Sequence, residues 1–145
     1  MEPTPWGTSR SVDIELIDPT GEVSRLEAEM VYSAADPYAV VTVFRSGPWP
    51  VRWVFARDLL ADGLFAPAGS GDVQIWPSLD INARAVVVIE LTSPHGEALL
   101  QAPAREVNEF LQRTFEMVPR GAEDMGINVD ETVLQLLGHQ DRVVE

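Results

Sequence analysis

The chain has 145 residues and a mass of 16.0 kDa, which is the size of one domain. It carries 23 acidic and 10 basic residues, all of the latter arginine, and its net charge at pH 7 is −13. This charge disfavours phosphate backbones and anionic lipids as partners. The absence of cysteine excludes a disulfide framework, a thiolate zinc site, an iron–sulfur cluster and a cysteine nucleophile.

The sequence carries no sign of export or membrane insertion. Residues 1–7 lack the basic region and the apolar stretch of a secretory signal. The longest unbroken apolar run, residues 85–89, is far shorter than the ~18 residues that a membrane-spanning helix needs. We therefore expect a cytoplasmic protein that does not enter the membrane.

The first part of the chain predicts a hairpin followed by an interior strand. Residues 1–11 are rich in Pro, Thr, Ser and Gly, and we expect a flexible N-terminal arm there. Apolar and acidic residues alternate over 12–16 and 26–32, the period of half-buried strands, and residues 18–21 are typical of a turn. A β-branched run over 38–44 is apolar on both faces, which favours a strand inside the sheet.

A fourth strand and a short helix complete this half. Over residues 51–55 the apolar side chains at odd positions share one face, and Arg52 lies on the other. Residues 56–63 suit a short helix that ends with Gly63 in the left-handed conformation.

The second half predicts three strands and two helices. The predicted strands cover residues 73–76, where Pro77 ends the strand, 85–91 and 97–101. Turns are predicted at 69–72 and 93–96. Pro103 is expected at the first position of a helix, whose apolar face would consist of Val107, Phe110, Leu111, Thr114 and Val118. A last helix over 128–137 is predicted from Asn128 as N-cap, Glu131 as its capping partner and Gly138 beyond the end.

Together these elements predict an α+β fold. A single domain is expected over residues 12–138, followed by a C-terminal tail at 139–145.

The sequence shows no arrangement typical of catalysis. The two imidazoles, His95 in a predicted turn and His139 in the predicted tail, have no accompanying nucleophile and acid in a recognisable pattern. Residues 69–72 lack the Lys-Ser/Thr end of a phosphate-binding loop and lead into a strand. Asp58 is explained as a favourable charge at the start of a short helix. We therefore expect no enzyme, no metal ion and no cofactor.

Tryptophans offer the clearest candidates for contacts with a partner, because they are enriched at interface hot spots. Trp53 falls on the apolar face of its strand and is expected in the core, whereas Trp76 could lie in the core or at a subunit contact. Trp49 lies between two prolines in a predicted turn, so strand alternation does not bury it. It is the leading candidate for partner contact, and the alternative is that it caps a sheet edge.

Several short motifs follow one another in the central and later parts of the chain: DPYAV at 36–40, VRWVFARDLLA at 51–61, WP at 76–77, LTSP at 91–94, GEALLQAP at 96–103 and VPRG at 118–121. In order and spacing they resemble the motifs of the SsgA-like family of sporulation-specific cell division proteins. The resemblance covers about residues 32–137.

The resemblance implies a fold similar to the whirly class, a twisted antiparallel, barrel-like sheet packed by helices, which assembles as a trimer. It also implies a non-enzymatic protein that helps to position or recruit the division machinery at sporulation septa. Its partners would be the tubulin-like division protein FtsZ or other SsgA-like proteins. Since the shared motifs are mostly apolar, partner binding would use the outer surface or the rims between subunits, where Trp49, Arg52 and Arg57 are candidates.

Single-stranded nucleic acid binding is the alternative, because the whirly fold elsewhere holds single strands with basic and aromatic surfaces. Such binding needs a cationic groove with stacking aromatics. This chain carries −13, hence about −39 for a trimer. The charge therefore favours an interaction protein and no nucleic acid. A cell-wall hydrolase is the weakest alternative, since the sequence shows neither paired carboxylates nor a metal site.

Overall fold

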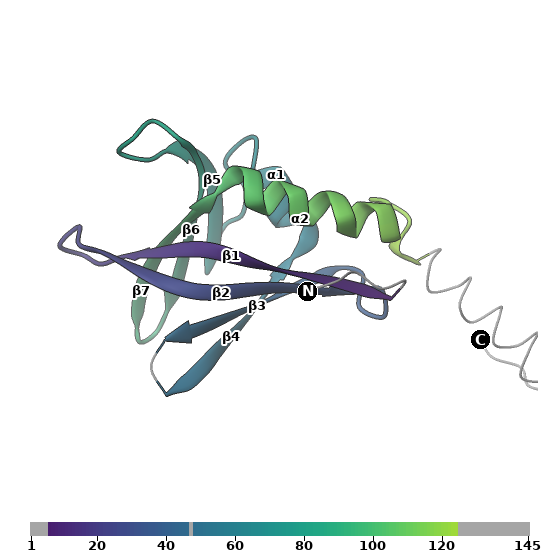
Figure 1. Ribbon diagram of the computed structural model, residues 1–145, viewed down its shortest axis with the longest axis horizontal. Helices are drawn as coiled ribbons and strands as arrows, with labels where there is room; N and C mark the ends of the chain where they lie inside the picture. The colour runs from purple at the N-terminus through teal and green to yellow at the C-terminus, as the bar shows by residue number, and fades with distance from the viewer. Residues whose placement is uncertain (1–5, 47, 125–145) are drawn as a thin grey trace, which may run out of the picture.

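The computed structural model describes residues 6–46 and 48–124. Within these residues, seven antiparallel strands form one curled sheet in the order β4-β3-β2-β1-β7-β6-β5, and two helices pack against it (Figure 1). The elements are β1 (Gly7–Ile17), β2 (Val23–Ser33), β3 (Ala39–Ser46), β4 (Trp49–Ala56), α1 (Arg57–Gly63), β5 (Val73–Leu79), β6 (Ala85–Ser93), β7 (Gly96–Pro103) and α2 (Ala104–Met117). The prediction of a single α+β domain with a twisted antiparallel sheet packed by helices is confirmed.

Strand β1 joins the two halves of the sheet. Its 11 residues all pair with β2, but only residues 15–17 also pair with β7. Along the rest of β1, helix α2 takes the place of a neighbouring strand. Glu106 Oε1 accepts a hydrogen bond of 3.1 Å from the backbone N–H of Asp13, and the Glu106 carbonyl oxygen accepts one of 2.9 Å from Arg10. The sheet therefore curls around α2 into a half-barrel (Figure 1).

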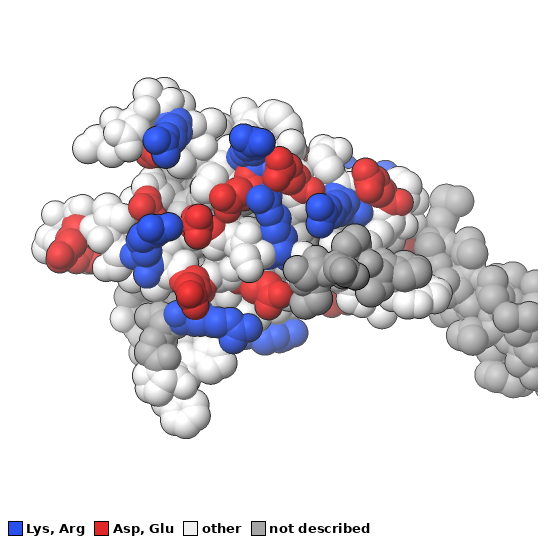
Figure 2. All heavy atoms as spheres, viewed as in Figure 1, with Lys and Arg blue, Asp and Glu red and all other residues white. Residues whose placement is uncertain are grey.

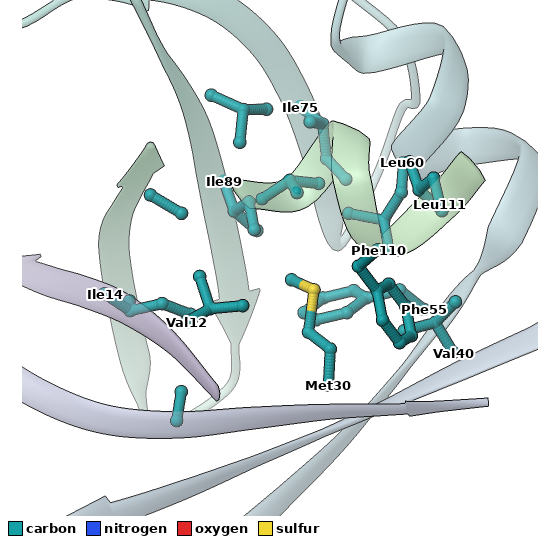
Figure 3. Packing of buried hydrophobic residues seen from close by; sticks show 14 of the residues in the cluster. Val12, Ile14, Met30, Val40, Phe55, Leu60, Ile75, Ile89, Phe110 and Leu111 are labelled. Atoms are coloured by element: carbon teal, nitrogen blue, oxygen red, sulfur yellow. The ribbon is translucent and has the colours of Figure 1, made fainter. Parts of the chain in front are cut away.

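The core fills the space between the curled sheet and α2 (Figure 3). Strands from both halves of the sheet and both helices contribute side chains to it, among them Val12, Ile14, Met30, Val40, Phe55, Leu60, Ile75, Ile89, Phe110 and Leu111. The helix face predicted from the spacing of apolar residues is confirmed, because Val107, Phe110, Leu111, Thr114 and Val118 are all buried. Each large apolar side chain buried in this way contributes about 1.5–3 kcal/mol to folding.

The predicted hairpin of the first two strands is also confirmed, with Asp18 organising its turn. The Asp18 Oδ1 atom accepts hydrogen bonds from the Thr20 hydroxyl at 2.6 Å and from the backbone N–H groups of Thr20 and Glu22, both at 2.9 Å. The hydrogen bond from the Thr20 side chain is the main reason that the pKa of Asp18 is lowered. Gly21 completes the turn with a φ of +90°, in the left-handed region that glycine tolerates.

The predicted flexible arm over residues 1–11 is wrong for residues 7–11, which form the first part of β1. Thr8 and Ser9 are buried there, and Ser9 Oγ donates a hydrogen bond of 3.1 Å to Glu29. These residues lack the apolar alternation of a half-buried strand. The ladder to β2 holds them in the sheet, and their partners in that ladder, residues 29–33, are 18 to 26 positions away in the sequence.

Two boundaries in the middle of the chain differ from the prediction. Gly63 does not adopt the left-handed conformation; it lies within α1, and a Cβ there would be 2.3 Å from Cγ2 of Ile75. Glycine is thus needed for the close approach of α1 to β5. Strand β5 does not stop at Pro77 but continues to Leu79, because β5 is an edge strand and the missing N–H costs no ladder bond.

Pro103 ends β7 and forms the N-cap of α2. It was expected at the first position of the helix and lies one position earlier. Its φ of −60° suits either place. The predicted helix over 128–137, the tail at 139–145 and His139 lie outside the described residues.

Candidate interaction surface

Arg57 is the first residue of α1, and its side chain has no exposed area. Its Nη1 donates hydrogen bonds to the carbonyl oxygens of Thr114 at 3.1 Å and Val118 at 2.7 Å, at the C-terminal end of α2. Its Nη2 donates one of 2.9 Å to Oε2 of the buried Glu123. The interpretation of Arg57 as a residue that contacts a partner is therefore wrong. It is a buried cation that satisfies the last carbonyls of α2.

Two aromatic rings complete the surroundings of Arg57. The guanidinium carbon lies 5.1 Å from the ring centre of Tyr32 and 4.3 Å from that of Phe115, within the range of cation–π attraction. The pKa of Glu123 is lowered, mainly because the carboxylate accepts a hydrogen bond from the backbone N–H of Glu123 itself. The hydrogen bond from Arg57 and its positive charge lower this pKa further, and burial opposes both effects. From the sequence alone, an Arg-Asp pair at a strand–helix junction is typical of a solvated surface, which is why this cluster was missed.

The same segment after α2 is held by a second set of polar contacts. Arg120 forms ion pairs with Asp58 at 3.2 Å and Asp62 at 2.9 Å, so Asp58 has a cationic partner in addition to its place at the start of α1. The Tyr38 hydroxyl donates a hydrogen bond of 2.6 Å to Asp124, and this bond is the main reason that the pKa of Tyr38 is raised to about 12. These contacts fasten the end of α2 to α1 and to the start of β3.

The exposed side chains of the β3–β4 hairpin form the candidate interaction surface. Trp49 is 77% exposed, Val51 47% and Val54 49%, and Arg52 lies exposed between the two valines. We call these four residues the hairpin surface; Trp49 and Val51 lie on one face of β4, and Arg52 and Val54 lie on the other. The two predicted residues Trp49 and Arg52 therefore lie together on one accessible strand, while their role in partner binding stays a prediction.

Arg52 differs from most cations of this protein. Six of the nine arginines in the described residues form an ion pair with Asp or Glu. In that part of the chain, Arg52, Arg84 and Arg113 have no such pair. They lie in three different parts of the fold, since Arg52 is on β4, Arg84 is in the turn before β6 and Arg113 is on α2. Their charges therefore do not build one cationic groove.

The other tryptophans of the central chain are less accessible. Trp53 packs against the core and stacks on Phe55 with ring centres 6.3 Å apart, as expected. Trp76 is half-buried on the outer face of β5, opposite Val88.

Further exposed apolar residues were missed by the sequence analysis. Phe65, Leu79 and Ile81 are 80%, 65% and 99% exposed, and they lie after α1 and around the turn between β5 and β6. Trp6, just before β1, is 65% exposed. The signal that could have identified Phe65 and Ile81 is their place in predicted loops, where strand or helix periodicity cannot bury an apolar side chain.

The described residues offer little for catalysis or metal binding. His95 lies exposed in the β6–β7 turn, where its backbone N–H donates to Ser93. A hollow of about 340 Å³ beside β1 and the β5–β6 turn is lined by carboxylates and arginines together. Within the described part of the chain, no group of three or more His, Asp or Glu side chains could hold a metal ion. Neither α1 nor α2 has the length and apolar character needed to span a bilayer.

Comparison with known proteins assigns the fold and its motifs to a family. The model of the family described as Streptomyces sporulation and cell division protein, SsgA, matches residues 26–123. The chain belongs to the SsgA family. The resemblance predicted from the sequence motifs is thereby confirmed at the level of the family.

Two curated members of the SsgA family are similar over most of this chain. The chain is 48% identical to the sporulation-specific cell division protein SsgB of Saccharopolyspora erythraea over 135 residues, which cover 91% of this chain and 94% of that protein. It is 50% identical to SsgB of Streptomyces coelicolor over 111 residues, which cover 76% of this chain and 80% of that protein. Both relatives are named for cell division.

Solved structures of the family share the fold. An SsgA-like sporulation-specific cell division protein from Thermobifida fusca has a TM-score of 0.80 at 39% identity and covers 94% of this chain and 100% of that one. A structure from work on SsgB mutations and longitudinal cell division during sporulation of Streptomyces coelicolor has a TM-score of 0.78 at 45% identity and covers 83% and 94%. The likeness to the whirly class and the trimeric assembly stay predictions.

Proposed function

We propose that this chain acts in sporulation-specific cell division as a non-enzymatic protein that positions or recruits the division machinery at the septum. Its direct partners would be FtsZ or other SsgA-like proteins. The observation that carries this proposal is the hairpin surface, on a protein whose relatives are named for cell division.

The composition of the hairpin surface supports a protein partner. Tryptophan and arginine are the residues most enriched at interface hot spots, and Trp49 and Arg52 are both accessible in the free chain. If the chain assembles as a trimer, three weak sites would act together on a polymer. The effective concentration of the second and third sites would then raise the overall affinity without any new contact.

The alternative of single-stranded nucleic acid binding gains no support from the distribution of charge. Single strands need a continuous cationic groove with aromatic platforms. In the described residues, the three arginines without an ion pair lie in separate parts of the fold, and the others are partly neutralised by carboxylates.

Co-sedimentation with FtsZ polymers tests the proposal in vitro. Wild-type protein should pellet with FtsZ assembled in GTP, and Trp49→Ala should weaken this binding. Phe65→Ala is the matched control, because Phe65 is an equally exposed aromatic residue outside the hairpin surface. Light scattering of the purified protein checks the trimer separately.

A fluorescent fusion in a sporulating actinomycete tests the role in the cell. The fusion should form foci at future septa before division, and the Trp49→Ala variant should lose them at equal abundance. Protein that neither binds FtsZ or a second SsgA-like protein nor localises to septa would refute the proposal. Tight, salt-sensitive binding to a single-stranded oligonucleotide would instead support the nucleic acid alternative.

A further inference from the structure

The two edges of the sheet differ in how they are protected. At the β5 edge, Ala68 and Ile75 exchange two backbone hydrogen bonds of 2.8 and 2.9 Å, and Pro77 removes one backbone donor. Such covering loops and prolines are the usual protection of an edge strand. Strand β4 forms the other edge, and its main neighbours in the described residues are β3 and the helix that follows it. The outer side of β4 is therefore open to a further strand.

The register shows which groups of β4 face this open side. Ala39 is opposite Ala56, and one step further the N–H of Arg57 donates to the carbonyl of Tyr38 at 2.7 Å. Pairs that exchange hydrogen bonds alternate with pairs that do not along an antiparallel ladder. The main-chain N–H and C=O groups of Ala56, Val54 and Arg52 therefore point away from β3, toward the open side.

Proline occurs on β4 where this alternation allows it. Pro50 continues the outward-facing series of Arg52 and Val54, so its missing N–H breaks no bond to β3. An incoming strand would find donors and acceptors on Arg52 and Val54. It would meet the side chains of these two residues on the outer face of the sheet and that of Val51 on the other face.

The segment around this edge carries one cation without an ion pair. Residues 37–57 contain three arginines and no Asp or Glu. Arg57 is buried against Glu123 and Arg45 pairs with Glu29 at 3.6 Å, so Arg52 is the arginine of this segment that lacks an ion pair in the described residues. In Figure 2, the lower projection, where Figure 1 places the β3–β4 hairpin, shows no red, and the blue spheres at its upper end lie directly below red ones. A partner that approaches β4 therefore meets Arg52 with no acidic side chain beside it on the hairpin.

We propose that the open edge of β4 binds an extended acidic segment of a partner protein, which adds to the sheet as a further strand. Carboxylates of this segment would meet Arg52 on the outer face of the sheet, and apolar side chains at alternate positions would meet Val51 on the other face. The proposal rests on the proposed function, because it gives the mode of binding at the hairpin surface. A two-fold pairing of β4 with the β4 of a second copy fits less well, since it brings two Arg52 side chains to one small surface.

Hydrogen exchange with a model peptide tests the mode of binding. The probe is an acetylated peptide of alternating glutamate and valine, as long as the eight residues of β4. Saturating peptide should slow exchange of the Arg52 and Val54 amides about tenfold and leave the amides of Val51 and Trp53, which already face β3, nearly unchanged. N-methylation of every second peptide amide should abolish binding in one of the two possible alternating patterns only.

Charge reversal tests the electrostatic part. Arg52→Glu should weaken the glutamate–valine peptide roughly tenfold and should strengthen a lysine–valine peptide of the same length. Arg113→Glu is the matched control, because Arg113 is also exposed without an ion pair in the described residues and lies on α2. It should bind both peptides as the wild type does, and circular dichroism should show both variants folded.

Several results would overturn the inference. Unchanged exchange at Arg52 and Val54 with bound peptide, or equal effects of the two charge reversals, would exclude strand addition at β4. Protection that rises with protein concentration without peptide would assign the edge to a second copy. Protection that is present without peptide and disappears when residues 125–145 are deleted would assign it to the chain's own C-terminal segment.

The inference and the proposed function fail in different ways. If FtsZ still binds while the β4 amides stay unprotected, the inference falls and the proposed function stands. If the acidic peptide protects β4 while neither FtsZ nor a second SsgA-like protein binds, the proposed function falls and the open edge keeps its assignment as a peptide site.

Discussion

Replacing Arg57 by methionine is the sharpest test of the structure, because this side chain joins α1 to the end of α2. The change leaves Glu123 buried without a cation, and it removes the donors to the carbonyl oxygens of Thr114 and Val118. Removing one partner of a buried ion pair costs about 3–5 kcal/mol, since the remaining charge stays away from water. Methionine fills a similar volume, so the loss would report polar contacts and not a cavity.

Urea unfolding at neutral pH, followed by circular dichroism, measures this loss. Arg57→Met should lower the free energy of unfolding by about 3–5 kcal/mol and the melting temperature by about 10 °C. Arg52→Met is the control, because Arg52 is exposed and unpaired in the described residues; it should change stability by less than about 0.5 kcal/mol. Adding Glu123→Leu to Arg57→Met should recover part of the loss, since no buried charge is then left unpaired.

Acidification gives an independent check. The lowered pKa of Glu123 stabilises the wild type above the ordinary value of 4.5, and this contribution is lost as pH falls through the pKa in the folded state. Without Arg57, two of the causes that lower the pKa of this carboxyl are lost, so its pKa rises relative to that in the wild type. The difference between wild type and Arg57→Met should therefore shrink as the pH is lowered toward 4.5. A variant within about 1 kcal/mol of the wild type at pH 7 would refute the reasoning.

Three further outcomes follow from single sites. Tyr38 should ionise at about pH 12, as measured by phenolate absorbance, and Asp124→Asn should lower this pKa. The raised pKa stabilises the folded state below pH 10.0, and this contribution disappears as the pH rises through 12. Ionisation of Tyr38 at pH 10.0 would contradict its contact with Asp124. Gly63→Ala should destabilise the fold in urea by about 1–3 kcal/mol, because its Cβ would overlap Ile75; a gain in stability, as helix propensity alone predicts, would argue against this packing. Trp49→Ala should change the free energy of unfolding by less than about 1 kcal/mol, since Trp49 is 77% exposed, and a larger loss would place it in the core.

Local patterns were sufficient where a segment's own side chains decide its structure. The alternation of apolar and acidic residues located the middle of β1 and β2, and the spacing from Val107 to Val118 identified the buried face of α2. The motifs predicted the family, because they are long and keep their order. Trp49 was correctly expected to escape burial, but it begins strand β4 opposite Ser46 and does not lie in the turn that was predicted for it.

The predictions failed where a distant segment decides. The first residues of β1 are polar and belong to the sheet because β2 and α2 hold them. Pro77 does not end its strand because β5 is at an edge, and Gly63 is required by a side chain of another strand. In each case the deciding contact involves residues that no local window contains.

The amino-acid sequence alone determined the class of fold, the family and the absence of cysteine chemistry. Periodicity and turn residues act over short stretches of sequence, and composition is a property of the whole chain, so none of these features depends on tertiary contacts. Only the folded chain decided which cations reach the surface. Arg52 and Arg57 are five positions apart on one motif, yet one is exposed on an open sheet edge and the other lies wholly buried between two rings and the end of α2. Burial of a charge depends on whether acceptors from elsewhere in the chain replace its water, and that is settled by packing.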